Sequence, residues 1–122
     1  MTYLEREPGF ENVKSFFAAA LRTGTKLIMT SVNFGEVYYI MLRESGQQKA
    51  REVEKVIVSL PLDIVEVDAG LAKVAGVFKA TKKMSYADCF AAALAKVRGG
   101  EVVTGDKEFR AVEDEVKIAW IG

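Results

Sequence analysis

The chain has 122 residues, half of them hydrophobic, and its 17 basic side chains balance 17 acidic ones. This length predicts one domain, spanning residues 1–122, and the neutral charge argues against non-specific binding to nucleic acid or to a membrane surface. There is no histidine and one cysteine, Cys89, which excludes a histidine general base, an internal disulfide and a cysteine-based zinc site.

Turn and cap signals divide the first half of the chain into alternating helices and strands. After a Pro-Gly turn at positions 8–9, apolar residues recur at helical spacing over positions 10–21 and stop before Gly24. Residues 26–30 are typical of a short buried strand. Ser31 then caps a helix that continues to about residue 44 and ends at a Ser-Gly pair.

The second half repeats this alternation. A helix over residues 47–60 ends at Pro61, because proline cannot extend a helix, and residues 62–67 form the second strand. Asp68 caps a helix over residues 69–80. Ser85 opens a further helix, which stops at a Gly-Gly pair at positions 99–100.

Two more strands follow, over residues 101–104 and residues 116–121, which makes four strands in all. Strands that alternate with helices predict a parallel sheet covered on both faces. The expected fold class is therefore α/β, a three-layer α/β/α domain.

Three acids occupy comparable places in this layout. Glu36 lies early in the helix after the first strand, Asp88 lies in the first turn of a later helix, and Asp106 follows the strand at residues 101–104. Ligands bind in parallel α/β folds at the carboxyl ends of the strands, and crowded carboxylates need a compensating cation. Oxygen ligands in a chain without histidine favour Mg²⁺ or Mn²⁺.

Each of these acids also has a purely structural interpretation. Asp88 stands three residues after Ser85, which is close to a capping box, Asp106 follows a glycine as turn residues do, and Glu36 is compatible with a solvated helix position. Their joint order favours the functional interpretation, mostly through the family resemblance described in the next paragraph. Cys89 is expected to pack as a small hydrophobic residue.

The segments SVNFGEVYY, SYADCFAAALA and VVTGDKEF resemble, in order and spacing, three successive acidic motifs of PIN-domain nucleases, above all the VapC-type toxins. The resemblance implies a compact α/β fold and RNA cleavage that depends on Mg²⁺ or Mn²⁺. It also implies a cognate antitoxin and a homodimer. By resemblance, Glu36, Asp88 and Asp106 are metal ligands and catalytic residues, and Thr104 lies at the edge of the pocket.

The sequence departs from the family at its amino terminus. The family has a first strand that ends in an Asp, whereas positions 1–9 resemble the family only from inside the first helix onward. We therefore expect the first strand and its Asp to be missing from this chain, and activity to be impaired. We also hypothesise that Met1 is an internal methionine and that the native protein extends upstream.

A ribonuclease also needs contacts to phosphate and a compartment that contains RNA. Candidates for phosphate contacts are Arg43, Lys82, Lys83, Lys107 and Arg110. No apolar run approaches the roughly 18 residues of a membrane span, and no signal peptide is visible, so we expect a cytoplasmic protein without a membrane partner.

The leading hypothesis is a metal-dependent endoribonuclease that acts as the toxin of a toxin–antitoxin pair. The alternative is a non-catalytic PIN-like module that binds a protein partner, which would fit the missing acid. A receiver-like phosphoacceptor domain ranks last, because it needs an acidic pair after the first strand.

Overall fold

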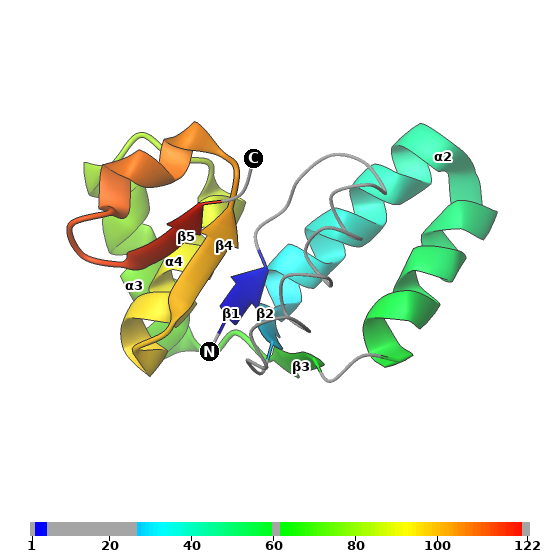
Figure 1. Cartoon of the computed structure of the whole chain (residues 1–122), viewed down its shortest axis with the longest axis horizontal. Helices are drawn as coiled ribbons and strands as arrows, with labels where there is room; N and C mark the ends of the chain where they lie inside the picture. The colour runs from blue at the N-terminus through cyan, green and yellow to red at the C-terminus, as the bar shows by residue number, and fades with distance from the viewer. Residues whose placement is uncertain (1, 5–26, 60–61, 121–122) are drawn as a thin grey trace.

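The computed structural model describes residues 2–4, 27–59 and 62–120. Their strands form a five-stranded parallel sheet in the order β3-β2-β1-β4-β5. The strands are β1 (Thr2–Leu4), β2 (Leu27–Thr30), β3 (Leu62–Val65), β4 (Glu101–Thr104) and β5 (Lys117–Trp120). The sheet, with its helices, confirms the α/β class (Figure 1).

The centre of the sheet corrects one expectation. We expected four strands and none near the amino terminus, but Thr2–Leu4 forms β1, which pairs in parallel with both β2 and β4. Three residues without flanking strand signals do not reveal a strand, whereas a place between two ladders satisfies their backbone groups on both sides. The hypothesis that the native protein extends upstream of Met1 stays a prediction.

The helix α2 (Ser31–Ser59) is two helical segments joined at a sharp bend, as the sequence predicts. Gly46 has φ 87° and ψ 173°, a conformation outside the helical region that glycine adopts readily. The start differs in detail: Asn33 N donates to Thr30 Oγ1 at 3.0 Å, so Thr30 provides the cap, and Ser31 Oγ instead accepts from Val67 N at 3.3 Å.

The two later helices begin and end as their caps predict. Asp68 Oδ1 accepts from Leu71 N at 2.8 Å at the start of α3 (Ala69–Thr81). The last long helix, α4 (Tyr86–Arg98), is capped by Ser85 and ends at Gly99, whose φ of 67° is left-handed. A short 3-10 helix, η1 (Lys107–Val112), connects β4 to β5. The expected helix over positions 10–21 lies outside the described residues.

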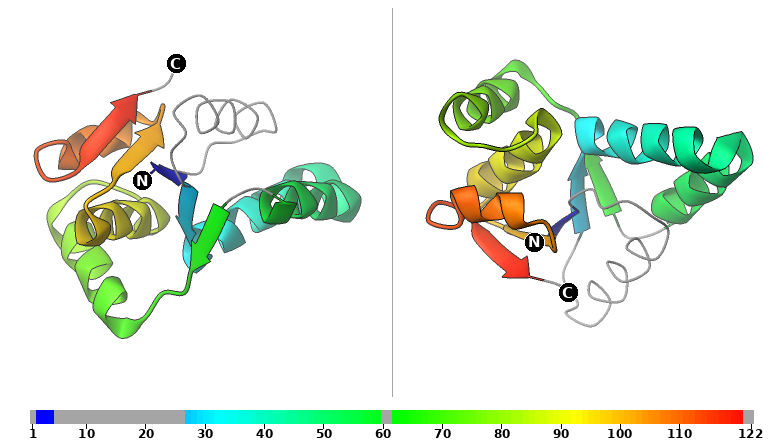
Figure 2. Two further views of the ribbon diagram at one scale, coloured as in Figure 1. Left: turned by 60° about the horizontal axis from the view of Figure 1, so that its bottom comes forward. Right: turned by 90° about the horizontal axis from the view of Figure 1, so that it is seen from above.

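The sheet is covered on two faces by separate hydrophobic clusters. In β2, Ile28 packs into the cluster under α3, α4 and η1, whereas Leu27 and Met29 pack against α2, because successive strand residues point to opposite faces. Figure 2 shows α3 and α4 lying together, with α2 reaching away from them. The two faces confirm the three-layer arrangement.

Candidate metal centre

The predicted site residues belong to elements that meet at the carboxyl edge of the sheet. The chain moves from β1 to β2 and β3 on one side and to β4 and β5 on the other, so β1 and β4 flank a topological switch point. Because α4 precedes β4 and returns along it, the first turn of α4 lies at the carboxyl end of β4. Crevices of this kind bind ligands in open α/β sheets.

The first turn of α4 holds Asp88 in a buried position. Ser85 adopts an extended conformation, and its Oγ accepts from Asp88 N at 3.2 Å. The Asp88 side chain is 3% exposed, and its Oδ1 is shielded from solvent. A carboxylate in the first turn is favoured by the positive end of the helix dipole.

The turn after β4 fixes Asp106 through the strand's last residue. Thr104 is fully buried, and its Oγ1 accepts from Asp106 N at 2.9 Å. Asp106 Oδ1 in turn accepts from Glu108 N at 2.9 Å, which makes Asp106 the N-cap of η1. The Gly-Asp turn expected from the sequence is therefore also the start of a helix.

Three carboxylates converge at this point. Asp88, Asp106 and Glu108 each offer an oxygen, and these oxygens lie within 4.8 Å of one another. At that distance and an effective dielectric constant of about 20, a pair of ionised carboxylates repels by about 3 kcal/mol. A divalent cation offsets this repulsion, and a donor set made only of carboxylate oxygen suits Mg²⁺ or Mn²⁺ rather than softer metals.

The structure brings Asp88 and Asp106 together, whereas Glu36 lies outside this three-acid cluster. Glu36 is half-buried on α2, with its Oε1 shielded from solvent. One turn earlier, the Asn33 side-chain amide donates to Ala87 O at 2.9 Å and so joins the start of α2 to the first turn of α4. Glu36 is therefore on an element that reaches the site.

Sequence reasoning missed Glu108. It is exposed, and its Oε1 accepts from Ser85 N at 2.9 Å, across 23 positions of the sequence. The available signal was the acid two residues after Asp106, which places Glu108 in the first turn of η1, next to its N-cap Asp106. The resemblance pointed only to Asp106, so the second acid of GDKEF received no role.

The candidate phosphate-contacting residues do not form one group in the part of the chain that the structure describes. Lys82 pairs with Glu115 at 3.4 Å, and the Arg43 guanidinium stacks 5.0 Å from the centre of the Tyr39 ring. Lys107 and Arg110 are exposed on η1, the element that carries Asp106 and Glu108. Lys83 is exposed as well and stands two residues before Ser85, at the start of α4.

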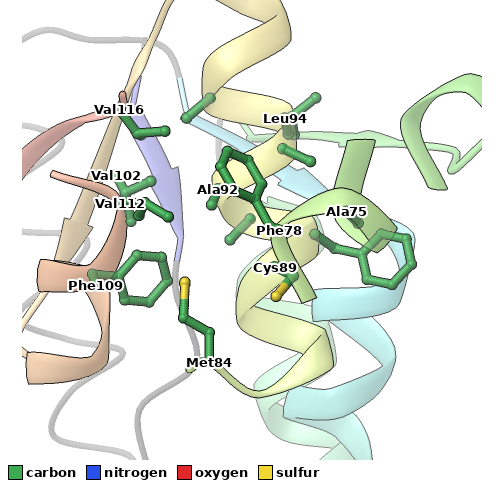
Figure 3. Packing of buried hydrophobic residues seen from close by; sticks show 14 of the residues in the cluster. Ala75, Phe78, Met84, Cys89, Ala92, Leu94, Val102, Phe109, Val112 and Val116 are labelled. Carbon is green, nitrogen blue, oxygen red and sulfur yellow. The ribbon is translucent and has the colours of Figure 1, made fainter. Parts of the chain in front are cut away.

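Cys89 is part of the core rather than the site. It is fully buried in the cluster under α3 and α4, close to Met84 and Phe78 (Figure 3). Burial raises the pKa of its thiol, an effect that Lys79 opposes and Asp88 reinforces. The thiol therefore stays protonated near neutral pH, which agrees with the expected packing role.

One acid near the amino terminus has no assigned role. Glu5 follows β1 directly in the sequence, but it lies outside the described residues. That the family's first Asp is missing from this chain stays a prediction.

A family model described as "PIN domain" matches residues 1–115 of the chain. A comparison with curated proteins finds no match. No helix among the described residues is both long and apolar enough to cross a membrane.

Several solved structures share the fold over nearly their full length. A chain of the DNA-bound VapBC complex from Salmonella typhimurium has a TM-score of 0.77 and 19% identity, with 98% of this chain and 96% of that chain covered. VapBC2 from Rickettsia felis, bound to a promoter DNA fragment, gives a TM-score of 0.73 at 14% identity, with 98% of each chain covered. VapC20 from Mycobacterium tuberculosis, described as a sarcin-ricin loop cleaving toxin, gives a TM-score of 0.71 at 13% identity, with 95% of this chain and 96% of that chain covered.

Proposed function

Because the chain belongs to the PIN domain family, we propose that it is a metal-dependent endoribonuclease and the toxin of a toxin–antitoxin pair. The observation that carries this proposal is the convergence of Asp88, Asp106 and Glu108 within 4.8 Å at the switch point of the sheet. A likeness to VapC20, described as a toxin that cleaves the sarcin-ricin loop, supports RNA as the substrate class.

In this proposal Asp88 and Asp106 hold Mg²⁺ or Mn²⁺, and Glu36 contributes directly or through a water molecule. When bound, the cation lowers the pKa of a water molecule and offsets negative charge on the phosphate, so hydrolysis needs no histidine base. Thr104 keeps Asp106 in place through the hydrogen bond that its Oγ1 accepts at 2.9 Å. The Asp88 backbone is held in the same way by Ser85.

Substrate binding is assigned to η1. Lys107 and Arg110 are exposed on η1, the six-residue helix that Asp106 caps, and in this proposal they contact the phosphates of the RNA. These residues position the backbone of the RNA and carry no information about its sequence.

The proposed partners are a cognate antitoxin and a second copy of this chain, in the cytoplasm. The likeness to chains of VapBC complexes supports the antitoxin. Exposed apolar side chains on the outer side of α2, such as Tyr39 at 50% and Leu42 at 43%, give a protein partner something to cover.

The decisive experiment measures cleavage of a structured RNA by this protein in Mn²⁺ and in EDTA. We expect cleavage in Mn²⁺ that Asp88→Asn abolishes. Asp68→Asn is the matched control, since Asp68 is a helix-capping acid outside the cluster. A protein that binds no divalent cation contradicts the nuclease proposal and leaves the non-catalytic module as the better hypothesis.

A further inference from the structure

The N-terminus of α4 contains a capping box whose two halves come from different parts of the chain. In a capping box, the N-cap side chain accepts from the N3 backbone amide, and the N3 side chain accepts from the N-cap amide. The first half is local here, because Ser85 Oγ accepts from Asp88 N at 3.2 Å. Asp88 is the N3 residue, so the pattern S-x-x-D predicts that its carboxylate closes the box.

The second half is supplied by η1 instead. Ser85 N donates to Glu108 Oε1 at 2.9 Å. Glu108 is itself held by its own backbone amide, which donates to Asp106 Oδ1 at 2.9 Å. A chain of hydrogen bonds therefore runs from Asp106 through Glu108 and Ser85 to the Asp88 amide.

The core fixes the position of this link. Phe109, the residue after Glu108, is fully buried and lies with Met84 and Val112 in the cluster beside α4 (Figure 3). Met84 immediately precedes Ser85 in the chain. The residues next to both partners of the Ser85–Glu108 hydrogen bond are thus packed in the same cluster, which holds the two segments in register.

We propose that Glu108 is a positioning residue that satisfies the Ser85 amide in place of Asp88, and so keeps the Asp88 carboxylate directed into the three-acid cluster. If Glu108 is removed, the Ser85 amide needs a new acceptor, and the stereochemistry of the capping box makes Asp88 the nearest one. The carboxylate then turns toward its own helix and away from Asp106. The part of this inference that concerns metal binding rests on the proposed function, whereas the hydrogen-bonding part does not.

Exposure distinguishes this role from that of a buried ligand. Asp88 is 3% exposed, whereas Glu108 is exposed to solvent and one of its two oxygens is occupied by the Ser85 amide. Groups that orient a metal ligand without binding the metal change affinity by roughly 10-fold to 100-fold when they are lost. The same loss of affinity is expected here from a residue that the family resemblance did not mark.

Two substitutions separate the hydrogen bond from the charge. Glu108→Gln keeps an oxygen that accepts from Ser85 N but removes the negative charge, whereas Glu108→Ala removes both. Asp68→Ala is the matched control, because it deletes the equivalent cap of α3, where Asp68 Oδ1 accepts from Leu71 N at 2.8 Å, without touching the cluster. Mn²⁺ affinity is measured by calorimetry on the whole chain, and the folded fraction is monitored by circular dichroism.

We expect Glu108→Ala to weaken Mn²⁺ binding by roughly 10-fold or more. Glu108→Gln should bind Mn²⁺ more tightly than Glu108→Ala, because both variants lose the same charge and only Gln keeps an acceptor for the Ser85 amide, whereas Asp68→Ala should match the unsubstituted chain. Equal losses in the Gln and Ala variants would show that Glu108 acts through its charge, as a ligand or beside one, and would overturn the proposal. Unchanged affinity in the Ala variant would overturn it as well.

A metal-free measurement tests the hydrogen bond independently of the proposed function. The proton shift of the Ser85 amide follows the ionisation of the carboxylate that accepts from it, and NMR resolves which carboxyl that is. In the unsubstituted protein the Ser85 shift should follow Glu108, and in Glu108→Ala it should follow Asp88. If it follows Asp88 in the unsubstituted protein, the proposal fails without recourse to any variant. A protein that shows the Glu108 pattern but binds no Mn²⁺ contradicts the proposed function and leaves this assignment standing.

Discussion

Asn33 provides the sharpest test of how α2 and α4 are held together beside the cluster. Its side chain is 1% exposed, its amide donates to Ala87 O at 2.9 Å, and its Oδ1 accepts from the Thr30 hydroxyl. Ala87 immediately precedes Asp88, so this amide links the first turns of the two helices. The informative pair of substitutions is Asn33→Ala and Asn33→Asp.

The alanine substitution removes both side-chain hydrogen bonds. The Ala87 carbonyl and the Thr30 hydroxyl each lose a partner, at a cost of about 1–3 kcal/mol per group. Thr30 is 1% exposed, so water cannot easily replace the lost partner. We expect a total loss of about 3 kcal/mol in the free energy of unfolding. For 122 residues, this corresponds to a fall in Tm of about 12 °C.

The aspartate substitution keeps the shape of the side chain but adds a pH dependence. A carboxylate cannot donate to Ala87 O, whereas a carboxylic acid can, and burial also disfavours the charged form. The pKa of the introduced carboxyl is therefore higher in the folded protein than its unfolded value of about 3.9. Between those two pKa values the folded state binds more protons, so the free energy of unfolding falls as pH rises.

Urea denaturation of the unsubstituted protein, Asn33→Ala and Asn33→Asp between about pH 4 and about pH 7 tests this expected pH dependence. The free energy of unfolding of the alanine variant should change with pH in parallel with that of the unsubstituted protein. The free energy of unfolding of the aspartate variant should approach the unsubstituted value at low pH and should fall below that of the alanine variant at neutral pH. The reasoning is refuted if the aspartate variant shows no additional pH dependence. It is also refuted if Asn33→Ala costs less than about 0.5 kcal/mol, the range of an ordinary surface substitution.

Three further outcomes follow from other parts of the molecule. The hydrogen bond from Lys96 at 2.8 Å, aided by Lys82, holds the pKa of Glu115 below its usual range. The contribution of Glu115 to the free energy of unfolding is therefore present above about pH 4.3 and is lost as pH falls through the lowered pKa. In urea denaturation, the difference in the free energy of unfolding between the unsubstituted protein and Glu115→Gln should become smaller in acid. Gly46→Ala should lower the free energy of unfolding by about 1–3 kcal/mol. The φ of 87° alone accounts for this loss, because no atom lies within 4 Å of the added Cβ. An increase in the free energy of unfolding in urea denaturation would contradict this. Free Mn²⁺ at about 100 times its Kd should raise the free energy of unfolding by about 2.7 kcal/mol, and thermal denaturation of Asp88→Asn should show no such rise.

Local chemistry was enough to predict most element boundaries. Gly46, Asp68, Ser85 and Gly99 each stop or start a helix through the conformation or the acceptor of that residue alone. The strand β1 has no such signal, since Thr2–Leu4 becomes a strand through pairing with β2 and β4, which lie more than 20 residues away. The cap of α2 was misplaced by one residue, because Thr30 and Ser31 are equally suited to it and only the contact from Val67 engages Ser31 elsewhere.

In the candidate site, too, some residues are predicted by the local sequence pattern and others depend on long-range contacts. Asp88 and Asp106 stand at a helix start and a strand end, positions that the pattern of helices and strands defines, and the structure brings them together. The role of Glu108 depends on a hydrogen bond to Ser85 across 23 positions, which no local pattern encodes. Glu36 was predicted from a motif of its own, SVNFGEVYY, but its relation to the cluster depends on how α2 packs against α4.

The acids of the cluster are also parts of the fold, so their charges bear on its stability. Asp106 caps η1, and Glu108 satisfies the amide of the residue that caps α4. A cap is worth about 1 kcal/mol, whereas ionised carboxylates this close repel by about 3 kcal/mol per pair. Capping therefore does not outweigh the repulsion. In the absence of a divalent cation, neutralising one acid while keeping its acceptor, as Asp106→Asn or Glu108→Gln does, should raise the free energy of unfolding.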